Sequence, residues 1–407
     1  MNKKPGRINR LELPNRVAGS SARQADLDLL SFAPENFLDT THFDTVRFPP
    51  PSWAVGEFER AAKNGSFAYT PYRGNAAVLK ALGDSLSRFL GVAVDPEQNI
   101  VLTPGTQAGL FTTLASLAGD GDRIALVDPD YLFNARILQF LGADIGYVPL
   151  HQSSTAPSID LEALEYEFAE NGARVLVFSN PNNPTGYIYP RHVLEEMAKL
   201  VLCYDVTIVV DSLYSRLVHK PHQYTHFVSL PGMQERVITL LGPSKTESLS
   251  GYRLGVVVGP AQLMPRLENV LSITSLRAPA YAQHLLPIWL RDDNEWLQKR
   301  LPEFTSLRTM TIESLRRLPW LQLEAQAGTA YVWPDVSALQ MSDSEVAKAL
   351  MKEAAILVSP GYQFGIQGDG HFRLCYARDE NEWSSALDRM VGVLNALAVE
   401  RGLEGGV

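Results

Sequence analysis

Five short runs of apolar residues constrain the fold of this 407-residue chain more than any other feature. The runs are rich in β-branched side chains and lie at 100–102, 124–127, 175–178, 206–210 and 237–241. Strands that are apolar at almost every position are buried on both faces, as in a parallel sheet with helices on both sides. Helical spacing of apolar residues separates several of the runs. This alternation predicts an α/β fold with a mostly parallel central sheet.

The apolar pattern changes along the chain, which predicts domains of unequal size. Residues 1–48 begin as a polar arm, and three consecutive prolines then form a rigid joint. We expect this segment to provide the arm and part of the small domain, and residues 49–287 to form the large domain. Residues 288–407 show helical patterns with short strands at 322–325 and 330–333, which predicts a small α+β domain.

The composition excludes several classes of partner. The chain carries 36 Lys and Arg against 45 Asp and Glu, a net charge of −9, so neither nucleic acid nor an anionic membrane is an expected partner. No apolar run is long enough to span a bilayer, and the basic N-terminus lacks the apolar core of a signal peptide. The two cysteines, Cys203 and Cys375, fit a reducing compartment rather than a disulfide framework. We expect a cytoplasmic protein without a metal site.

Polar residues follow three of the strand-like runs. Asn183 and Asp211 come after two of them, and Lys245 comes after a third. Ligands of parallel sheets collect beyond the carboxyl ends of the strands, so these side chains could converge. A lysine amine that loses its proton can form an imine with an aldehyde, and the hydroxyl of Ser244 and the guanidinium of Arg253 suit a phosphate. The pattern favours a phosphorylated aldehyde cofactor. Taken singly, a solvated lysine, a capping aspartate and a turn asparagine are ordinary alternatives.

Four ordered motifs resemble those of one enzyme family. They are Asn180-Pro-Asn-Asn-Pro-Thr-Gly186, Asp211-x-x-Tyr214, Ser244-Lys245 with Gly251-x-Arg253-x-Gly255, and Arg373 in Phe-Arg-Leu-Cys-Tyr-Ala. In these motifs the chain is similar to the class I/II aminotransferases, fold-type I enzymes that depend on pyridoxal 5'-phosphate. The resemblance implies an aspartate aminotransferase-like fold, a cofactor bound covalently to Lys245, an α-amino acid substrate and a homodimer.

The resemblance also implies roles around the cofactor ring. A buried carboxylate raises the proton affinity of a nearby pyridine nitrogen, and Asp211 is the candidate. Tyr214 and Asn183 would hydrogen-bond the phenolic oxygen of the ring, which makes Lys245, Asp211 and Tyr214 the expected catalytic residues. Tyr131 follows the run at 124–127 and would stack on the ring. A buried aromatic residue is the alternative for each tyrosine.

The cofactor phosphate is expected at a turn that follows the first apolar run. Gly105 and Thr106 lie where a helix begins, and free amide groups at a helix start bind anions. Pro104 removes one donor from this turn, and a turn without a ligand is the alternative. In the family a tyrosine just before a glycine reaches the phosphate of the neighbouring subunit. Tyr69 fits this position best and Tyr72 is the alternative, which implies shared active sites in a homodimer.

Two residues are expected to contact the substrate besides Asn183. By the resemblance, Arg373 would hold the α-carboxylate through two parallel hydrogen bonds, although its segment alternates like a half-exposed strand. Glu35 lies in Pro34-Glu-Asn-x-Leu38, which is similar to the Ala-Glu-Asn-x-Leu segment of 1-aminocyclopropane-1-carboxylate synthases. It could therefore be a substrate-site group or a linker acid.

The expected reaction is transfer of an amino group from an α-amino acid to a 2-oxo acid, with Lys245 moving a proton at the substrate α-carbon. The Glu35 segment supports an alternative in secondary metabolism, namely β/γ-elimination, γ-substitution with cyclisation, or oxidation of an amino acid. A third hypothesis is a non-catalytic ligand-sensing module of a transcription regulator. Such a module needs a DNA-binding domain, and about forty residues before the proline joint are too few to supply one.

Overall fold

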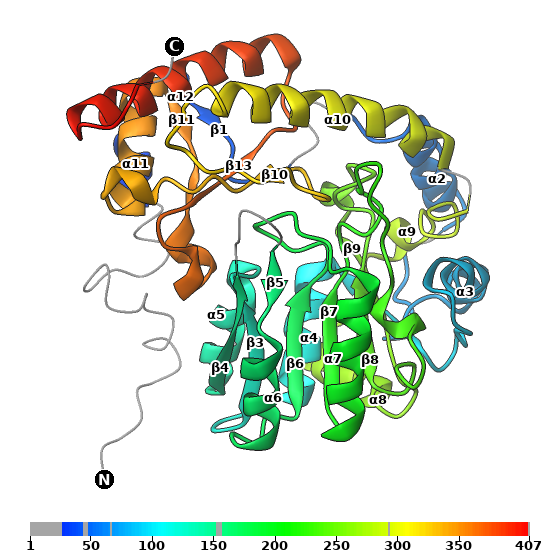
Figure 1. Cartoon of the computed structure of the whole chain (residues 1–407). Helices are drawn as coiled ribbons and strands as arrows, with labels where there is room; N and C mark the ends of the chain where they lie inside the picture. Colours follow the sequence, from blue (N-terminus) through cyan, green and yellow to red (C-terminus); the bar gives the residue numbers. More distant parts are fainter. Residues whose placement is uncertain (1–26, 44–47, 66, 152–156, 292–293, 406–407) are drawn as a thin grey trace.

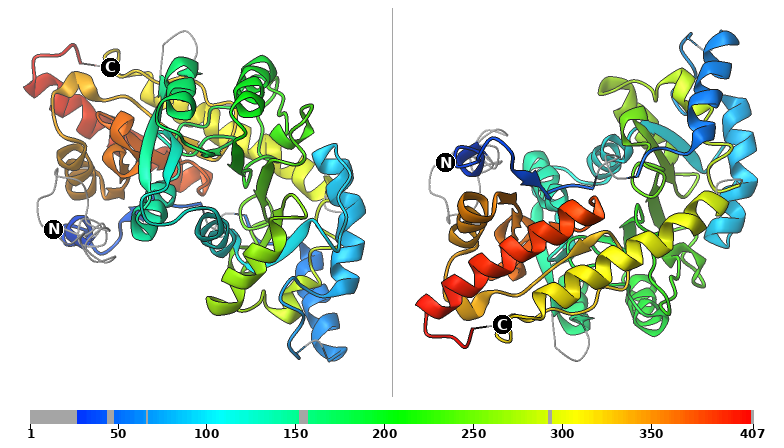
Figure 2. Two further views of the ribbon diagram at one scale, coloured as in Figure 1. Left: turned by 90° about the horizontal axis from the view of Figure 1, so that it is seen from below. Right: turned by 90° about the horizontal axis from the view of Figure 1, so that it is seen from above.

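The computed structural model describes residues 27–43, 48–65, 67–151, 157–291 and 294–405. Figure 1 shows a lower unit built around a large sheet and an upper unit covered by two long helices, α10 (Asn294–Leu315) and α12 (Glu380–Glu400). In Figure 2 these helices run side by side over the small sheets, and the indole of Trp383 on α12 donates to the hydroxyl of Thr311 on α10 at 2.8 Å.

The large sheet has eight strands, and its central strands are parallel. In spatial order they are β2 (Ile100–Pro104), β9 (Leu254–Val258), β8 (Val237–Leu241), β7 (Thr207–Asp211), β6 (Val175–Ser179), β3 (Arg123–Asp128), β4 (Asp144–His151) and β5 (Ser158–Ile159). β9 is antiparallel to both neighbours and β5 is antiparallel to β4, whereas the strands from β4 to β8 pair in parallel. All five predicted runs contribute to this sheet, which confirms the expected α/β fold.

Helices cover both faces of the sheet because successive strand residues point to opposite sides. In β6, Leu176 and Phe178 belong to one apolar core, and Val175 and Val177 belong to the other. The helices of the first core include α3 (Ala76–Leu90), α6 (Leu161–Ala169) and α7 (Arg191–Cys203), and those of the second are α4 (Thr106–Leu117), α5 (Leu132–Leu141) and α8 (Met264–Ile273). Two further helices contact each other beside α3, namely α2 (Ser52–Lys63) and α9 (Ala280–Gln283).

The upper unit is built from short strands and helices. Its elements are the antiparallel sheet β10 (Tyr331–Val332), β13 (Phe372–Cys375) and β12 (Ser359–Pro360), the parallel pair β1 (Leu38–Asp39) and β11 (Ile356–Leu357), and α11 (Asp343–Ala349) with the π-turn η5 (Leu350–Ala354). Single 3₁₀ turns are η2 (Phe227–Ser229), η3 (Ser250–Tyr252), η4 (Ser337–Leu339), η6 (Gly361–Phe364) and η7 (Ile366–Gly368).

Of the two strands predicted here, the one at 330–333 is present as β10 and the one at 322–325 was wrong. Only Gln322 pairs, as an isolated bridge with Asp335. The next carbonyls accept from side chains instead, because Arg316 donates to Leu323 at 3.3 Å and Gln326 donates to Glu324 at 2.6 Å.

A third apolar core joins the N-terminal segment to the C-terminal one. Phe43 and Phe48 belong to this core, and Phe43 meets Phe304 of α10 edge to face at 5.5 Å. Ala54, only six residues after Phe48, belongs to the core of the large sheet instead. On this basis we propose the division expected from the sequence, with the small domain formed by residues up to 48 and from 288 onward. Most of the predicted N-terminal arm, residues 1–26, lies outside the described residues.

Candidate active site

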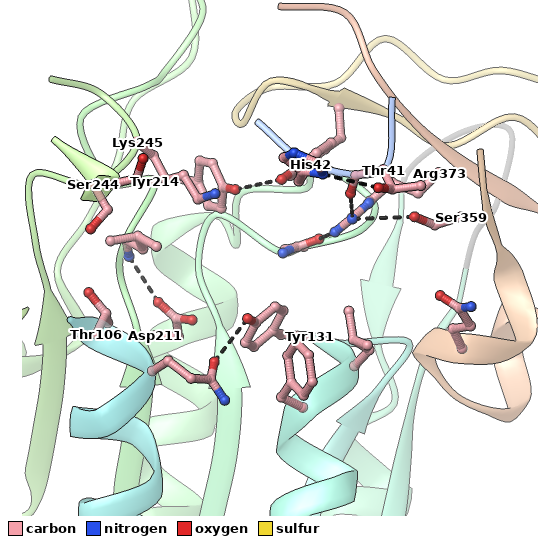
Figure 3. A pocket seen from close by; sticks show the side chains of 18 of the residues that line it. Thr41, His42, Thr106, Tyr131, Asp211, Tyr214, Ser244, Lys245, Ser359 and Arg373 are labelled. Carbon is pink, nitrogen blue, oxygen red and sulfur yellow. Dashed lines mark hydrogen bonds between the residues drawn. The ribbon is translucent and has the colours of Figure 1, made fainter. Parts of the chain in front are cut away.

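A cavity of about 460 Å³ opens between the two domains, beyond the carboxyl ends of the parallel strands. Nine of the expected site residues line it: Thr106, Tyr131, Asn183, Asp211, Tyr214, Ser244, Lys245, Arg253 and Arg373. In Figure 3 the labelled members of this set face one another across the cavity, with Arg373 on the small-domain side and Thr106 at the start of α4. The fold therefore brings together side chains that are far apart in the sequence.

Lys245 lies in a turn that follows β8, and its side chain is half-buried at the cavity wall. Its Nζ donates to the backbone carbonyl of Phe43 at 3.0 Å. Phe43 belongs to the small-domain core, so the lysine amine lies at the boundary between the two domains.

Asp211 is the last residue of β7, and its carboxylate faces the same cavity. Burial raises its pKa to about 6, while a hydrogen bond from the backbone N–H of Leu213 at 3.0 Å and the charge of Lys245 both lower it. A cationic group placed beside this carboxylate would therefore lower its pKa and favour the charged form.

The start of α4 faces the guanidinium of Arg253 and carries no side-chain cap. Gly105 precedes the helix with φ +86°, and α4 has no side-chain hydrogen bond at this end. A Cβ added to Gly105 would come within 2.1 Å of the guanidinium of Arg253, and one added to Gly255 within 2.6 Å of the amide nitrogen of Thr106. Only glycine permits this close approach of the helix start to the guanidinium and to the strand that carries Gly255. Helix amides, a hydroxyl and an arginine are the donor set that a phosphate requires, so these residues fit the phosphate of the expected cofactor.

Arg373 is buried, with 4% of its surface exposed, so the half-exposed alternative was wrong. One guanidinium nitrogen donates to Oδ1 of Asn183 at 2.7 Å, and another donates to the backbone carbonyl of Thr41 and to Ser359 Oγ at 3.4 Å. The guanidinium lies 4.1 Å above the ring of Tyr331. Its Nε is buried and has no partner among the described residues. A buried cation with an unused donor is suited to bind a carboxylate.

Tyr214 and Tyr131 are two of the tyrosines that line the cavity. The hydroxyl of Tyr214 donates to that of Tyr331 at 2.9 Å, and burial raises the pKa of Tyr214 well above its ordinary value. The hydroxyl of Tyr131 donates to Oε1 of Gln107 at 3.0 Å, and burial likewise raises its pKa. Both phenols are therefore neutral hydrogen-bond donors in this pocket.

Asp130 organises the neighbouring turns, a role that sequence reasoning missed. Its carboxylate is buried and accepts from the backbone N–H of Tyr131 at 2.6 Å, from that of Ser179 at 2.9 Å, and from the side-chain amides of Asn134 at 3.0 Å and Asn182 at 3.1 Å. Burial raises its pKa to about 7. The position of Asp130 directly before Tyr131 is the feature of the sequence that could have indicated this role.

The small domain supplies further pocket residues that no motif indicated. The polar and aromatic ones are Asp39, Thr41, His42, Tyr331, Ser359 and Gln363. β1 carries the first of them into place by pairing with β11, where Leu38 is opposite Ile356. Because this pairing joins segments more than 300 residues apart, local sequence patterns do not reveal it.

Three expected site residues do not line the cavity. Gly105 lies just beneath it, against Arg253. Glu35 is exposed in the loop before β1. The chain reaches the pocket only at β1, where Leu38 and Asp39 pair with β11. Tyr69 is 83% exposed on the large domain.

Tyr69 belongs to a small exposed cluster. The guanidinium of Arg277 lies 4.7 Å from the ring centre of Tyr69 and 4.3 Å from that of Tyr72, and its Nε donates to the backbone carbonyl of Thr70. The structure therefore holds both candidate tyrosines on one surface, away from the pocket of their own chain.

Over the described ranges, no helix is long and apolar enough to cross a membrane. The same residues contain no group of acidic, histidine or cysteine side chains that could hold a metal ion. Cys203 is an exposed thiol and Cys375 a buried one.

Comparisons with known proteins agree with the pocket chemistry. The family model described as aminotransferase class I and II matches residues 38–390. An aspartate aminotransferase of Musicola paradisiaca is 27% identical over 86% of this chain and 86% of that protein, and an arginine–pyruvate transaminase of Pseudomonas aeruginosa is 29% identical over 76% and 78%. The crystal structure of an aspartate aminotransferase from Rhodobacter sphaeroides covers 92% of this chain and 99% of its own, with a TM-score of 0.86 and 31% identity.

These matches confirm the expected family, the aspartate aminotransferase-like fold and the cofactor. They also favour an enzyme over a ligand-sensing module. The chain belongs to the class I and II aminotransferases, which use pyridoxal 5'-phosphate.

Proposed function

We propose that this protein transfers the amino group of an α-amino acid to a 2-oxo acid, with Lys245 as the covalent anchor of pyridoxal 5'-phosphate. The observation that carries the assignment is the common cavity of Lys245, Asp211 and Arg373. When bound, the cofactor supplies an electron sink for the bonds of the substrate α-carbon. The protein contributes binding, orientation and proton movement.

Asp211 is proposed to keep the ring nitrogen protonated. Its carboxylate is the acidic group at the end of β7, and burial already holds its pKa near 6. A cationic nitrogen beside it would favour the charged carboxylate, so each group stabilises the charge of the other. Tyr214 and Asn183 are proposed to orient the ring through its phenolic oxygen, and Tyr131 through stacking.

The cofactor phosphate is proposed to bind at the start of α4. The amide groups of the first helical turn, the hydroxyl of Ser244 and the guanidinium of Arg253 form the donor set, and Gly105 permits their close approach. The helix dipole adds favourable potential for an anion at this end.

Arg373 is proposed to bind the substrate α-carboxylate. Its stacking on Tyr331 and its bond to Asn183 fix the plane of the guanidinium. This would orient the substrate α-carbon, and Nζ of Lys245 would accept a proton from that carbon and release it again during the reaction.

We also propose a homodimer formed through one apolar surface. Half of the exposed large apolar side chains of the described residues fall in two segments, and we name this set the α2–α9 surface: Val55, Phe67, Tyr69, Tyr72, Ile273, Leu276 and Tyr281. The two segments are adjacent, since Phe58 on α2 meets Tyr281 on α9 at 5.1 Å. Large exposed apolar patches mark protein interfaces. Tyr69 would reach the phosphate site of the partner subunit from this surface. Light scattering of wild type and Tyr69→Asp should show a dimer and a monomer respectively, and a monomeric wild type would contradict the proposal.

A single-turnover experiment tests the reaction. The holoenzyme is mixed with a panel of amino acids that includes aspartate and arginine, without a 2-oxo acid. Amino-group transfer predicts loss of the lysine-bound absorbance in proportion to enzyme, with one equivalent of 2-oxo acid formed. Continuous release of ammonia, peroxide or a γ-substituent would establish the elimination, substitution or oxidation alternative instead. Glu35, which suggested that alternative, is exposed outside the cavity, so the aminotransferase assignment is the stronger. We further propose a cytoplasmic location, supported by the two free thiols.

A further inference from the structure

We propose that a buried ion pair behind the cavity, Arg216 with Glu247, positions Lys245 for the proposed reaction, so the inference rests on the function given above. Oε1 of Glu247 accepts from Nη1 of Arg216, and its Oε2 accepts from the hydroxyl of Thr246. The Glu247 side chain is fully buried and that of Arg216 is 7% exposed. Neither residue lines the cavity, so their effect must pass through their neighbours.

The pair connects the two segments that carry the proposed catalytic groups. Glu247 lies two residues after Lys245 and belongs to the same turn. Arg216 lies two residues after Tyr214 and five after Asp211, in the segment that follows β7. A strong directional contact between these segments fixes the lysine relative to the aspartate and the tyrosine.

The turn that bears the lysine needs an external support. It contains no regular helix or strand, and its own backbone bonds are those of Leu249 N–H to the Pro243 carbonyl at 3.1 Å and Ser248 N–H to the Lys245 carbonyl at 3.3 Å. Ser248 has φ +57°, a left-handed conformation that is unfavourable for a residue other than glycine. Its hydroxyl is buried and has no partner among the described residues. Such a strained turn persists only where its surroundings hold it, and Glu247 provides a fixed point within it.

Stability alone does not explain a buried ion pair at this position. The desolvation of two charges offsets most of their attraction, and apolar side chains of similar volume often stabilise a fold as well or better. A charged pair differs from an apolar contact in its directional geometry. We therefore assign the pair a positioning role rather than a mainly stabilising one.

The chain offers a matched control in the pair Arg123 with Glu167. This pair is bidentate, with both nitrogen-to-oxygen distances at 2.8 Å, and Glu167 is 7% exposed. It joins the first residue of β3 to α6, at the amino ends of the strands, whereas the cavity lies beyond their carboxyl ends. Glu167→Gln removes the same charge from the same type of pair without touching the lysine turn.

The test compares holoenzymes of wild type, Glu247→Gln, Arg216→Gln, the double variant and Glu167→Gln. For each protein, the pH titration of the lysine-bound cofactor absorbance, kcat, KM for the amino acid and the thermal midpoint are measured. We expect Glu247→Gln to lower kcat about tenfold or more, to change KM by less than about threefold and to shift the spectroscopic pKa. We expect Glu167→Gln to lower the thermal midpoint only. The double variant should recover thermal stability, because no charge is left buried alone, but should keep the low kcat and the shifted pKa.

Two results would overturn the positioning role alone. One is a Glu247→Gln enzyme that loses thermal stability but keeps the wild-type kcat and titration. The other is a double variant that regains the wild-type kcat and the wild-type titration of the lysine-bound cofactor. A wild type that forms no lysine-bound cofactor would overturn the proposed function, and the positioning role with it.

Discussion

Buried polar groups are satisfied differently at the two ends of the strands of the central sheet. At the amino ends of the strands, where β3 begins, Arg123 and Glu167 form a bidentate ion pair, and Asn171 donates a further hydrogen bond to Glu167 at 3.0 Å. At the carboxyl ends of the strands, which face the cavity, burial raises the pKa of Asp211 to about 6. Across the cavity, a buried nitrogen of Arg373 on β13 has no partner among the described residues. Groups held in costly states collect at functional sites. The cavity therefore holds buried polar groups in unfavourable states, as expected where a ligand would satisfy them.

The largest expected effect comes from removing the amine at the cavity edge. Lys245→Ala should lower kcat by about 10³-fold or more, because both the anchor and the proton carrier are lost. The lysine-bound absorbance should disappear. Lys199→Ala, which removes an exposed lysine of α7 paired with Glu196, is the control and should keep both. A Lys245→Ala enzyme with wild-type turnover would contradict the account.

A smaller effect is expected from the buried guanidinium. Arg373→Gln should lower kcat/KM for amino acids on the order of 10²-fold, mostly through KM, because a buried charged hydrogen-bond donor is lost. Arg317→Gln removes an exposed arginine that pairs with Asp388 and should leave the kinetics unchanged. Steady-state kinetics of both variants make the comparison. If both variants lowered kcat/KM to the same extent, the proposed role of Arg373 in the pocket would be contradicted.

Asp211 allows a test of stability against pH. Its folded pKa of about 6 lies above the ordinary value of 3.8, so its burial opposes folding most strongly above pH 6 and not at all below about pH 4. Without cofactor, Asp211→Asn should therefore raise the free energy of unfolding by about 2 kcal/mol at pH 8, and the gain should vanish as the pH falls from 6 to 4. Denaturant titrations at several pH values measure it. Asp388→Asn is the exposed control, and a gain that is independent of pH would count against the explanation.

The smallest effect is expected at a helix start that serves stability alone. Asp160 caps α6 by accepting from the N–H of Ala163 at 2.8 Å, and this bond lowers the pKa of Asp160. Asp160→Ala should reduce the free energy of unfolding by about 1 kcal/mol at pH 7. The difference should disappear as the pH falls through the lowered pKa, because the protonated side chain is a weaker acceptor. Asp160→Asn, which retains the cap, should lose less. The uncapped α4 faces the cavity instead, where we propose that a phosphate takes this role.

The sequence predicts those parts of the molecule that local chemistry determines. Continuous β-branched runs can only be buried strands, so β6, β7 and β8 were predicted, and the residues just after them converge as expected. Gly105 was predicted at a helix start, whereas the close approaches at Gly105 and Gly255 are seen only in the structure.

The remaining features depend on contacts between distant segments. Thr41 and Tyr331 enter the cavity because β1 pairs with β11 and β10 pairs with β13, and neither pairing has a local signature. The alternating pattern of β13 could not by itself decide the burial of Arg373, because the same pattern is typical of a half-exposed strand. Arg216 and Glu247 lie in separate segments of the sequence, and only the fold pairs them.

Borohydride reduction of the holoenzyme followed by peptide mass mapping tests the central claim most directly. The account predicts a phosphopyridoxyl group on the Nζ of Lys245, in one equivalent per chain, and none after prior incubation with an amino acid substrate. A label on another lysine, or no label on a protein that has been reconstituted with pyridoxal 5'-phosphate, would contradict it.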